Sequence, residues 1–284
     1  MIEIKSISKE KFDEVYLNHQ YQYFIHSSDF SLRRKANNWD SDFLGFFENQ
    51  QLVGAMVLAG RSAFLGRKRY EINSGPLLNY ENLNQTQACF EALSEYLISI
   101  KALSCEMSPN ITINLYNDEK TQLVDKNLYM QVLENLGWVY DQESDKELSK
   151  IRWFFKKDLK KFNTYKQLND SYDRETKRLI NNAKNFPLKV VELSKDNLER
   201  AVNILETTAE RRGFDTRDLN YHKSLFKYLN QKDEVKYLVV ELNVVEYLNI
   251  LDKEAEDLKQ AIKDDSDNTS KRAQNRINQN KDQL

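Results

Sequence analysis

Three short segments of this sequence carry clusters of basic side chains that could bind phosphate. The first is residues 26–35, where a serine-capped helix start is followed one or two turns later by Arg33, Arg34 and Lys35. Charge-assisted hydrogen bonds from such a group can hold a diphosphate. The alternative is a solvated helix end whose cations complement the helix dipole.

The second cluster lies in residues 176–184, a basic helix in a basic stretch of the chain. Its cations could contact the phosphates of a small ligand or of an RNA backbone, and they are Lys177, Arg178 and Lys184. Alternatively, the apolar residues between them form the buried stripe of a helix whose other face is wet. The residues leave both interpretations open.

The third cluster surrounds a helix end at residues 207–217. Gly213 followed by Phe214 is ordinary C-capping and needs no function to explain it. Arg211, Arg217 and Tyr221 gather around the same corner. Guanidinium groups present paired donors that suit phosphate or carboxylate, so this corner is a candidate substrate site.

The composition of the chain limits the kinds of partner that these clusters could bind. The chain has 284 residues, 40% of them hydrophobic, so it can bury a core and has room for two domains. Its 42 basic and 44 acidic side chains leave a formal charge of −2. No global field therefore favours nucleic acid or an anionic membrane, and an anionic partner must be held by local patches.

The sequence lacks the motifs that several kinds of chemistry require. Cys89 and Cys105 form no Cys-x-x-Cys motif and no Cys/His cluster at ligand spacing. The three histidines are widely spaced, which disfavours a nucleophilic triad. None of the seven glycines belongs to the Gln/Arg-x-x-Gly-x-Gly/Ala loop that cradles acetyl-CoA. No apolar run approaches the ~18 residues of a membrane span, so we expect a cytoplasmic protein.

The elements that must position the clusters begin with a mixed sheet and flanking helices. Alternation and helical spacing predict strands at 2–7, 43–47, 52–58 and 70–78, an extended segment at 105–115, a strand at 151–155, and helices at 8–16, 85–102 and 127–136. A polar turn at residues 48–51 predicts a hairpin. A second unit begins where the composition shifts, since residues 146–189 hold 13 Lys or Arg against 5 Asp or Glu.

The second unit repeats the order of helices and strands. Helices are predicted at 174–185, 194–211 and 218–229, and strands at 188–193 and 235–242. Beyond residue 243, apolar residues recur at spacings of three and four in a coiled-coil seam: Leu248, Leu251, Ala255, Leu258 and Ile262. A polar turn at 263–270 and a returning helix with Ala273, Ile277 and Leu284 would complete an antiparallel arm.

A resemblance to a known family rests on three of these segments. A helix end with Thr, Arg and Phe at three-residue steps, followed by Arg and Tyr, is found here as Thr208, Arg211, Phe214, Arg217 and Tyr221. Residues 176–183 and 26–39 match a basic helix and an N-terminal aromatic and cationic pattern. Over most of residues 20–260, the sequence resembles the Fem-type (FemABX) aminoacyltransferases of peptidoglycan bridge synthesis.

The resemblance implies an α+β fold of tandem GNAT-like (acyl-CoA N-acyltransferase-like) domains with mixed sheets. We expect a first domain at residues 1–150, the start of a second at 151–242, and the coiled-coil arm at 243–284, cut short. A second domain with one strand pair and no further sheet cannot cover its own hydrophobic faces. We therefore expect downstream residues to be missing.

The implied activity is transfer of an aminoacyl group from aminoacyl-tRNA to the stem-peptide lysine of a peptidoglycan precursor. That precursor is lipid II or its nucleotide-linked form, UDP-MurNAc-pentapeptide. The amine attacks an activated ester, so aminoacyl-tRNA serves as co-substrate and no cofactor is implied. The resemblance also allows peripheral contact with the inner membrane face and a partner Fem-like enzyme.

Carried over position by position, the resemblance assigns Arg34, with Lys35 beside it, to the precursor's phosphates. Tyr221 and Arg211 would line the same cleft, and Lys177 stands where the family has Arg. The full set of expected substrate-binding residues is Arg34, Lys35, Ser108, Lys177, Arg178, Thr208, Arg211, Phe214, Arg217 and Tyr221. No catalytic residue is assigned.

Three positions depart from the family pattern. His26 replaces Gln, Ser74 stands where Arg precedes Gly-Pro, and Ser108 replaces Asp. The lost carboxylate at Ser108 motivates a second hypothesis of another class. In that hypothesis, the chain is a truncated, non-catalytic paralogue that binds precursor, RNA or a partner enzyme.

Overall fold

The computed structural model of the chain describes residues 1–109, 111, 114–116, 122–125, 128–140, 157–229, 235–266, 268 and 270–283. The chain divides into two compact units. Unit 1 comprises residues 1–152 and 205–235, and unit 2 comprises residues 153–204 and 236–284. The domain boundaries expected at residues 150 and 242 stay a prediction, because these units group residues by contact and not by position along the chain. The strand expected at residues 151–155 lies outside the described residues.

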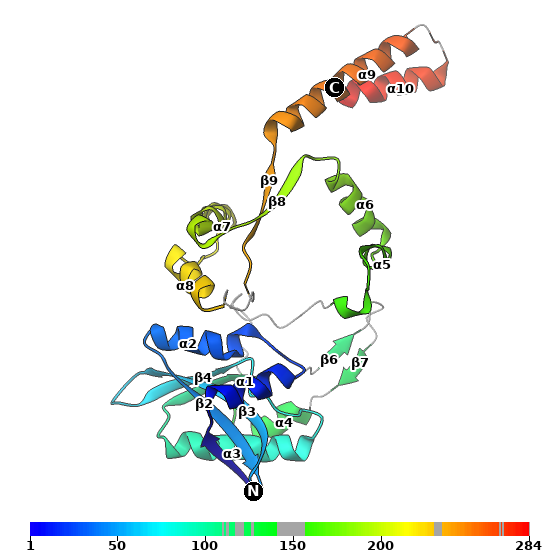
Figure 1. The fold of residues 1–284 in the computed structure, drawn as a ribbon. Coiled ribbons are helices and arrows are strands. Elements are labelled where there is room, and N and C mark those ends of the chain that lie inside the picture. The colour runs from blue at the N-terminus through cyan, green and yellow to red at the C-terminus, as the bar shows by residue number, and fades with distance from the viewer. Residues whose placement is uncertain are drawn as a thin grey trace. The chain divides into compact units, whose positions relative to one another are not determined.

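Unit 1 is built on a five-stranded mixed sheet (Figure 1). Its strands, in spatial order, are β1 Ile2–Ser6, β2 Asp40–Glu48, β3 Gln51–Ser62, β4 Lys68–Asn73 and β5 Ser104–Ser108. The first three pairings are antiparallel, and β4 pairs with β5 in parallel. A separate antiparallel pair follows, formed by β6 Asn114–Tyr116 and β7 Gln122–Asp125.

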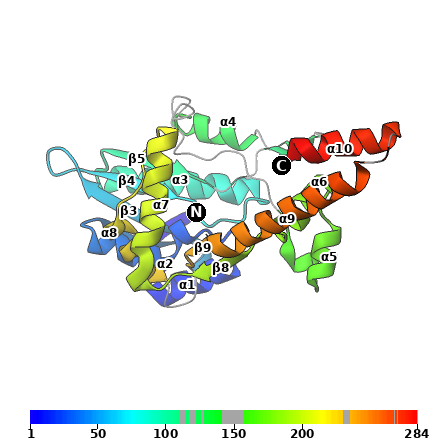
Figure 2. The ribbon, with the colours of Figure 1, turned by 90° about the horizontal axis from the view of Figure 1, so that it is seen from above.

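Helices cover both faces of this sheet (Figures 1 and 2). The helices of unit 1 are α1 Lys9–Asn18, the short 3-10 helix η1 Phe24–His26, α2 Ser28–Ala36, α3 Leu83–Ser99, α4 Leu128–Asn135 and α8 Leu219–Leu229, of which α8 packs against α2. The helix α7, Leu198–Arg212, begins in unit 2 and ends in unit 1. Each of α1, α2 and α3 starts at a side-chain cap, with Ser8, Ser27 and Asn82 as acceptors.

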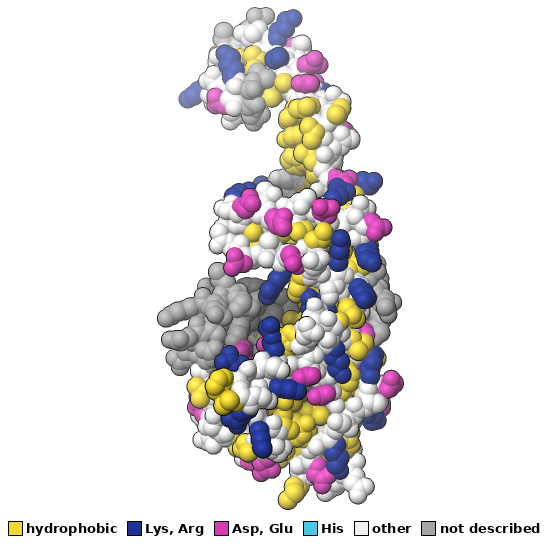
Figure 3. Space-filling model, turned by 90° about the vertical axis from the view of Figure 1, so that its left-hand side faces the viewer, with side chains coloured by type: hydrophobic (Ala, Val, Ile, Leu, Met, Phe, Trp, Pro, Cys, Tyr) yellow, Lys and Arg dark blue, Asp and Glu magenta, His cyan; other side chains and the backbone are white. Residues whose placement is uncertain are grey.

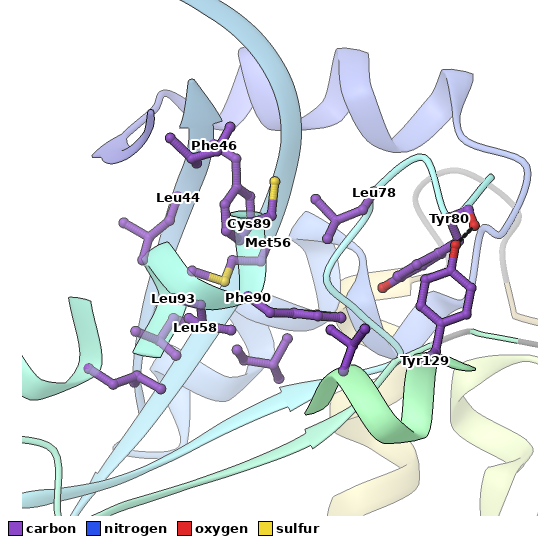
Figure 4. Packing of buried hydrophobic residues seen from close by; sticks show 14 residues of the cluster. Leu44, Phe46, Met56, Leu58, Leu78, Tyr80, Cys89, Phe90, Leu93 and Tyr129 are labelled. Carbon is purple, nitrogen blue, oxygen red and sulfur yellow. Dashed lines mark hydrogen bonds between the residues drawn. The ribbon is translucent and has the colours of Figure 1, made fainter. Parts of the chain in front are cut away.

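The β2–β3 hairpin separates two apolar clusters because successive strand residues face opposite sides. On one face, Met56 and Leu58 pack with Phe90 of α3 in the main core (Figure 4). On the other face, Ala55 and Val57 pack against Phe12 of α1. The hairpin turn itself lies at Asn49 and Gln50, which both have positive φ. The polar turn expected at residues 48–51 is confirmed.

A buried histidine fixes the entry to α2. The His26 side chain is 1% exposed; its Nδ1 lies 2.7 Å from the Asn73 carbonyl oxygen, and its Nε2 lies 3.3 Å from the Val57 backbone nitrogen. A neutral imidazole satisfies both partners when Nδ1–H donates to Asn73 and Nε2 accepts from Val57. Gly75 leaves room for the ring, since a Cβ there would lie 2.3 Å from its Cε1. The imidazole thereby ties α2 to β3 and to the end of β4.

Unit 2 contains short helices, one strand pair and a helical arm. Its elements are η3 Leu159–Lys161, α5 Tyr165–Asp170, α6 Arg174–Ala183, β8 Leu188–Glu192, η4 Lys195–Asn197, the start of α7, β9 Leu238–Leu242, α9 Val244–Asp265 and α10 Lys271–Gln283. The strands β8 and β9 are antiparallel, with Val190 opposite Val240. Both of these valines are exposed. One face of this ribbon is therefore apolar and uncovered in the described part of the chain.

The arm is an antiparallel pair of helices, as the seam of apolar residues predicts. Ala273 and Ile277 of α10 are buried, and Arg276 forms a 2.6 Å ion pair with Asp265 of α9. Near the start of α9, Leu248 and Leu251 remain exposed. No helix in the described part of the chain is both long enough and apolar enough to span a bilayer. The described residues likewise contain no group of three or more His, Cys, Asp and Glu side chains able to hold a metal ion.

The buried His26 makes the stability of the protein depend on pH. Burial lowers the pKa of His26 from 6.5 to about 4, with the nearby Arg34 acting in the same direction. As pH falls, the unfolded chain takes up this proton before the native protein does. The contribution of neutral His26 is therefore full above pH 6.5 and is lost as pH falls toward 4, by roughly 3 kcal/mol at about 1.4 kcal/mol per pKa unit.

This expectation is checked by measuring the free energy of unfolding with urea across that pH range. The His26→Gln variant should lack this component, so its free energy of unfolding should fall by roughly 3 kcal/mol less than that of the wild-type protein. His19→Gln serves as a control for removing a histidine elsewhere in unit 1. Parallel curves for the wild-type protein and His26→Gln would contradict the assignment.

Candidate substrate-binding site

The candidate site is a line of arginines and aromatic rings across unit 1. At the end formed by α8, the Arg217 guanidinium lies 5.5 Å from the Tyr221 ring centroid. The guanidinium of Arg33 from α2 lies 4.3 Å from the centroid of the same ring and 5.3 Å from that of the Phe30 ring. Each contact falls within the range of a cation–π interaction. These contacts join α8 to α2.

The line continues along α2 to the sheet. The guanidinium of Arg34 lies 5.5 Å from the Phe30 ring and 5.0 Å from the ring of Trp39. The backbone N–H of Trp39 donates to the Arg34 carbonyl oxygen at 3.1 Å, so the turn that ends α2 places this ring. Arg61 of β3 lies over the same ring at 5.7 Å. We call this set the arginine–aromatic ladder: Arg217, Tyr221, Arg33, Phe30, Arg34, Trp39 and Arg61.

A carboxylate of the sheet forms an ion pair with the ladder. Glu71 of β4 accepts from Arg34 at 3.0 Å and, through the same oxygen, from Asn73 Nδ2 at 2.9 Å. The Arg34 side chain is only 14% exposed, so its charge is held in place and partly shielded from water. The ladder holds four arginines, and Glu71 pairs with one of them, Arg34. Such an arrangement favours an anion.

A groove of about 440 Å³ opens at the sheet end of the ladder. It is lined by Trp39, Arg61, Ser62, Ala63, Phe64, Arg69 and Glu71. Arg61 and Arg69 stand directly opposite each other in the β3–β4 pairing. Like charges at opposed positions of antiparallel strands are destabilising, and a bound anion would relieve this repulsion. The groove thus suits a phosphate-bearing ligand.

A larger groove, of about 510 Å³, lies between α1 and residues 77–81. Its walls mix charges of both signs, with Lys11, Glu14 and Glu81 among them. It contains none of the residues expected from the sequence to bind substrate. The ladder and its smaller groove are therefore the better candidate for an anionic ligand.

Ser108 lies at the carboxyl end of β5, where it pairs with Asn73 of β4. In the same parallel pairing, Glu106 stands opposite Glu71. Because side chains two apart share a face, Glu106 and Ser108 lie on the same face of the sheet as Glu71 and Asn73. Ser108 is exposed. Ser108, which the resemblance places where the family has Asp, therefore has carboxylates for neighbours on its own face.

The end of α7 carries three further residues of the expected site. Gly213 has φ +71°, and the backbone nitrogens of Gly213 and Phe214 lie 2.8 and 3.2 Å from the Ala209 carbonyl oxygen. The predicted C-cap is confirmed. Thr208 is half-buried, whereas Arg211 and Phe214 are exposed. All three belong to unit 1, and the chain leads directly from them to Arg217 and Tyr221.

Three expected residues have contacts of their own outside the ladder. The ammonium of Lys35 is 6.0 Å from the Phe43 ring, beside the apolar cluster of α1. Lys177 Nζ donates to the Asp170 carbonyl oxygen at 2.9 Å, and Arg178 pairs with Glu175 at 2.6 Å. Both of the latter belong to unit 2. Of the ten residues expected from the sequence, the structure brings Arg34, Arg217 and Tyr221 together in the ladder.

Sequence reasoning missed Trp39, Arg61, Arg69 and Glu71 as site residues. A tryptophan shortly after a cationic helix end could have indicated Trp39 as a site residue. The strand register was needed for the others, because residue 61 opposes residue 69 only once the hairpin turn is known. Their roles depend on pairing between distant parts of the chain.

Comparison with known proteins identifies the lineage. The model of the FemAB family matches residues 7–284, and this chain belongs to the FemAB family. The fold is similar to that in the crystal structure of FemX, which superposes with a TM-score of 0.63 at 19% sequence identity, covering 99% of this chain and 69% of that one. The expected α+β fold with a mixed sheet is confirmed.

Named relatives are aminoacyltransferases. Aminoacyltransferase FemB of Staphylococcus epidermidis is 26% identical over 233 residues, which cover 79% of this chain and 54% of the relative. Aminoacyltransferase FemA of Staphylococcus aureus is 25% identical over 270 residues, covering 92% of this chain and 63% of the relative. The chain therefore spans just over half to about two thirds of the length of these relatives.

The ladder predicts that substituting either of two adjacent cations of α2 changes the affinity for an anion by different amounts. Arg34→Gln should weaken binding of inorganic pyrophosphate by about tenfold or more, since charge-assisted hydrogen bonds contribute roughly 1.5 to 3 kcal/mol each. Lys35→Gln should change the affinity by less than about twofold, because a solvent-exposed charge outside a site contributes little. Isothermal titration calorimetry measures both. Equal losses in the two variants would contradict the site, and thermal unfolding checks that both fold.

Proposed function

We propose that this chain takes part in transferring an aminoacyl group from aminoacyl-tRNA to the stem-peptide lysine of a peptidoglycan precursor. Membership of the FemAB family supports this proposal, as do relatives named as aminoacyltransferases. The observation that carries it is the arginine–aromatic ladder with its groove, because both forms of the precursor contain a diphosphate. No cofactor is required, since the ester of aminoacyl-tRNA is already activated.

The ladder holds the precursor by charge and by stacking. Arg61 and Arg69, which are cross-strand neighbours in the groove wall, bind the diphosphate, and Arg34 approaches it from α2. Guanidinium groups suit this role because they offer paired N–H donors. The Trp39 ring contacts the guanidinium groups of both Arg34 and Arg61 and helps to keep them in place. Binding energy from the diphosphate then aligns the distant amine for reaction.

The reaction needs positioning more than strong acid or base catalysis. The neutral amine nitrogen attacks the ester carbonyl carbon, an amide bond forms, and the bond to the ribose oxygen of the tRNA breaks. The amine loses one proton and the ribose hydroxyl gains one. The polar face of β4 and β5, with Glu71, Glu106 and Ser108, suits an amine that must be oriented before attack.

The basic helix α6 supplies a place for the tRNA backbone. Arg178 and Lys184 are exposed, and Lys177 is half-buried. Exposed cations on one helix favour phosphate contacts of low sequence specificity. Contact with the inner membrane face and with a partner Fem-like enzyme completes the proposal.

A non-catalytic role is the second candidate. It is favoured by Ser108, which supplies no carboxylate at the position where the family has one. In that case, the ladder still binds precursor, but no aminoacyl group is transferred. Binding and turnover therefore separate the two functions.

Transfer of a radiolabelled amino acid from charged tRNA to the nucleotide-linked precursor tests the proposal. The wild-type chain should transfer label, and Arg34→Gln should lower kcat/KM by about tenfold or more, mainly through KM. Ser108→Asp should raise kcat, because it restores the family carboxylate beside the reacting amine. If the wild-type chain binds precursor but transfers no label, the non-catalytic role is correct.

A further inference from the structure

The hairpin between β3 and β4 ends in exposed hydrophobic side chains. The hairpin projects beyond the helices of unit 1 in both ribbon views (Figures 1 and 2). At its tip, Phe64 is 68% exposed and Leu65 is 82% exposed. Adjacent exposed large side chains at the end of a projecting hairpin are unlike the scattered apolar residues of an ordinary surface.

The geometry of the turn does not account for Leu65. Ala63 N–H donates to the Arg67 carbonyl oxygen, and Arg67 N–H donates to the Phe64 carbonyl oxygen, each at 3.0 Å. Leu65 and Gly66 are the two central residues, with φ of +50° and +71°. Such turns favour Asn-Gly, because a leucine is strained at positive φ. Asparagine would suit the backbone at position 65 better than the leucine that is present.

Basic side chains surround this tip. Residues 61–69 contain four cations and no acidic residue, and the cations are Arg61, Arg67, Lys68 and Arg69. Lys68 reaches Asp40 at 2.6 Å, and Arg67 donates to the Lys101 carbonyl oxygen at 3.1 Å. Figure 3 shows the side of the molecule from which the hairpin projects, and in its lower part Lys and Arg side chains stand around hydrophobic ones.

We propose that this hairpin docks unit 1 onto an anionic lipid bilayer, with Phe64 and Leu65 inserted at the interface and Arg67 and Lys68 facing the headgroups. The combination of apolar insertion and basic residues is what holds interfacial segments on anionic membranes. Charge complementarity favours a bilayer over an apolar protein groove, which would leave the cations beside the tip desolvated.

Docking here has a consequence for the substrate, and this consequence rests on the proposed function. The groove shares Arg61, Phe64 and Arg69 with the hairpin, so it opens at the membrane surface when the tip is inserted. The diphosphate of a lipid-linked precursor lies at that same surface. The acceptor preferred by the docked protein is therefore the lipid-linked precursor.

Vesicle co-sedimentation tests the docking without any substrate. The wild-type chain should bind vesicles of phosphatidylglycerol and phosphatidylcholine more tightly than vesicles of phosphatidylcholine alone. Leu65→Asn, which suits the turn, should weaken this binding by about tenfold. Arg67→Gln should weaken it by about fivefold. Ile98→Ser is the matched control, because Ile98 is an apolar residue of unit 1 that is 76% exposed on α3, and its vesicle binding should equal that of the wild-type chain.

Equal binding of the wild-type chain and Leu65→Asn to the anionic vesicles would overturn the inference, as would equal binding of the wild-type chain to both kinds of vesicle. Transfer to the soluble nucleotide-linked precursor separates this result from the proposed function. Leu65→Asn should leave that transfer unchanged while lowering transfer to precursor in vesicles. If the wild-type chain binds vesicles but transfers no aminoacyl group to the soluble precursor, the proposed function is overturned and the docking inference is not.

Discussion

A neutral imidazole buried between three segments is the constraint on which the site depends. His26 joins the entry of α2 to the backbone of Val57 in β3 and of Asn73 at the end of β4. Protonation would place a charge where no water reaches and remove the acceptor for Val57. The glycine at position 75 is what allows the ring to approach this closely. With the start of α2 fixed, the positions of Arg33 and Arg34 follow from the helix geometry.

The arginines of the ladder are tolerated because aromatic faces separate them. Phe30, Trp39 and Tyr221 each lie beneath two guanidinium groups. A ring face stabilises a nearby cation without neutralising it. The region therefore keeps its positive charge in a fixed geometry, which lowers the ordering cost of binding an anion. Glu71 orients Arg34 through its ion pair.

Local patterns in the sequence predicted local structure well. The capped start of α2, the turn at Asn49, the C-cap at Gly213 and the returning helix of the arm all follow from short-range rules of helix and turn chemistry. The expected strand at residues 70–78 was too long, because β4 ends at Asn73, before Ser74 takes positive φ. The expected extended segment at 105–115 is divided between β5 and β6.

The candidate site was predictable only in part. Arg34, Arg217 and Tyr221 could be found because each stands in a recognisable segment. Trp39, Arg61 and Glu71 could not, because their roles depend on contacts among α2, β3 and β4 that no local pattern specifies. A crystal structure with the nucleotide-linked precursor tests the central claim most directly. The account predicts the diphosphate within hydrogen-bond distance of Arg61, Arg69 or Arg34, and a diphosphate bound away from all three would contradict it.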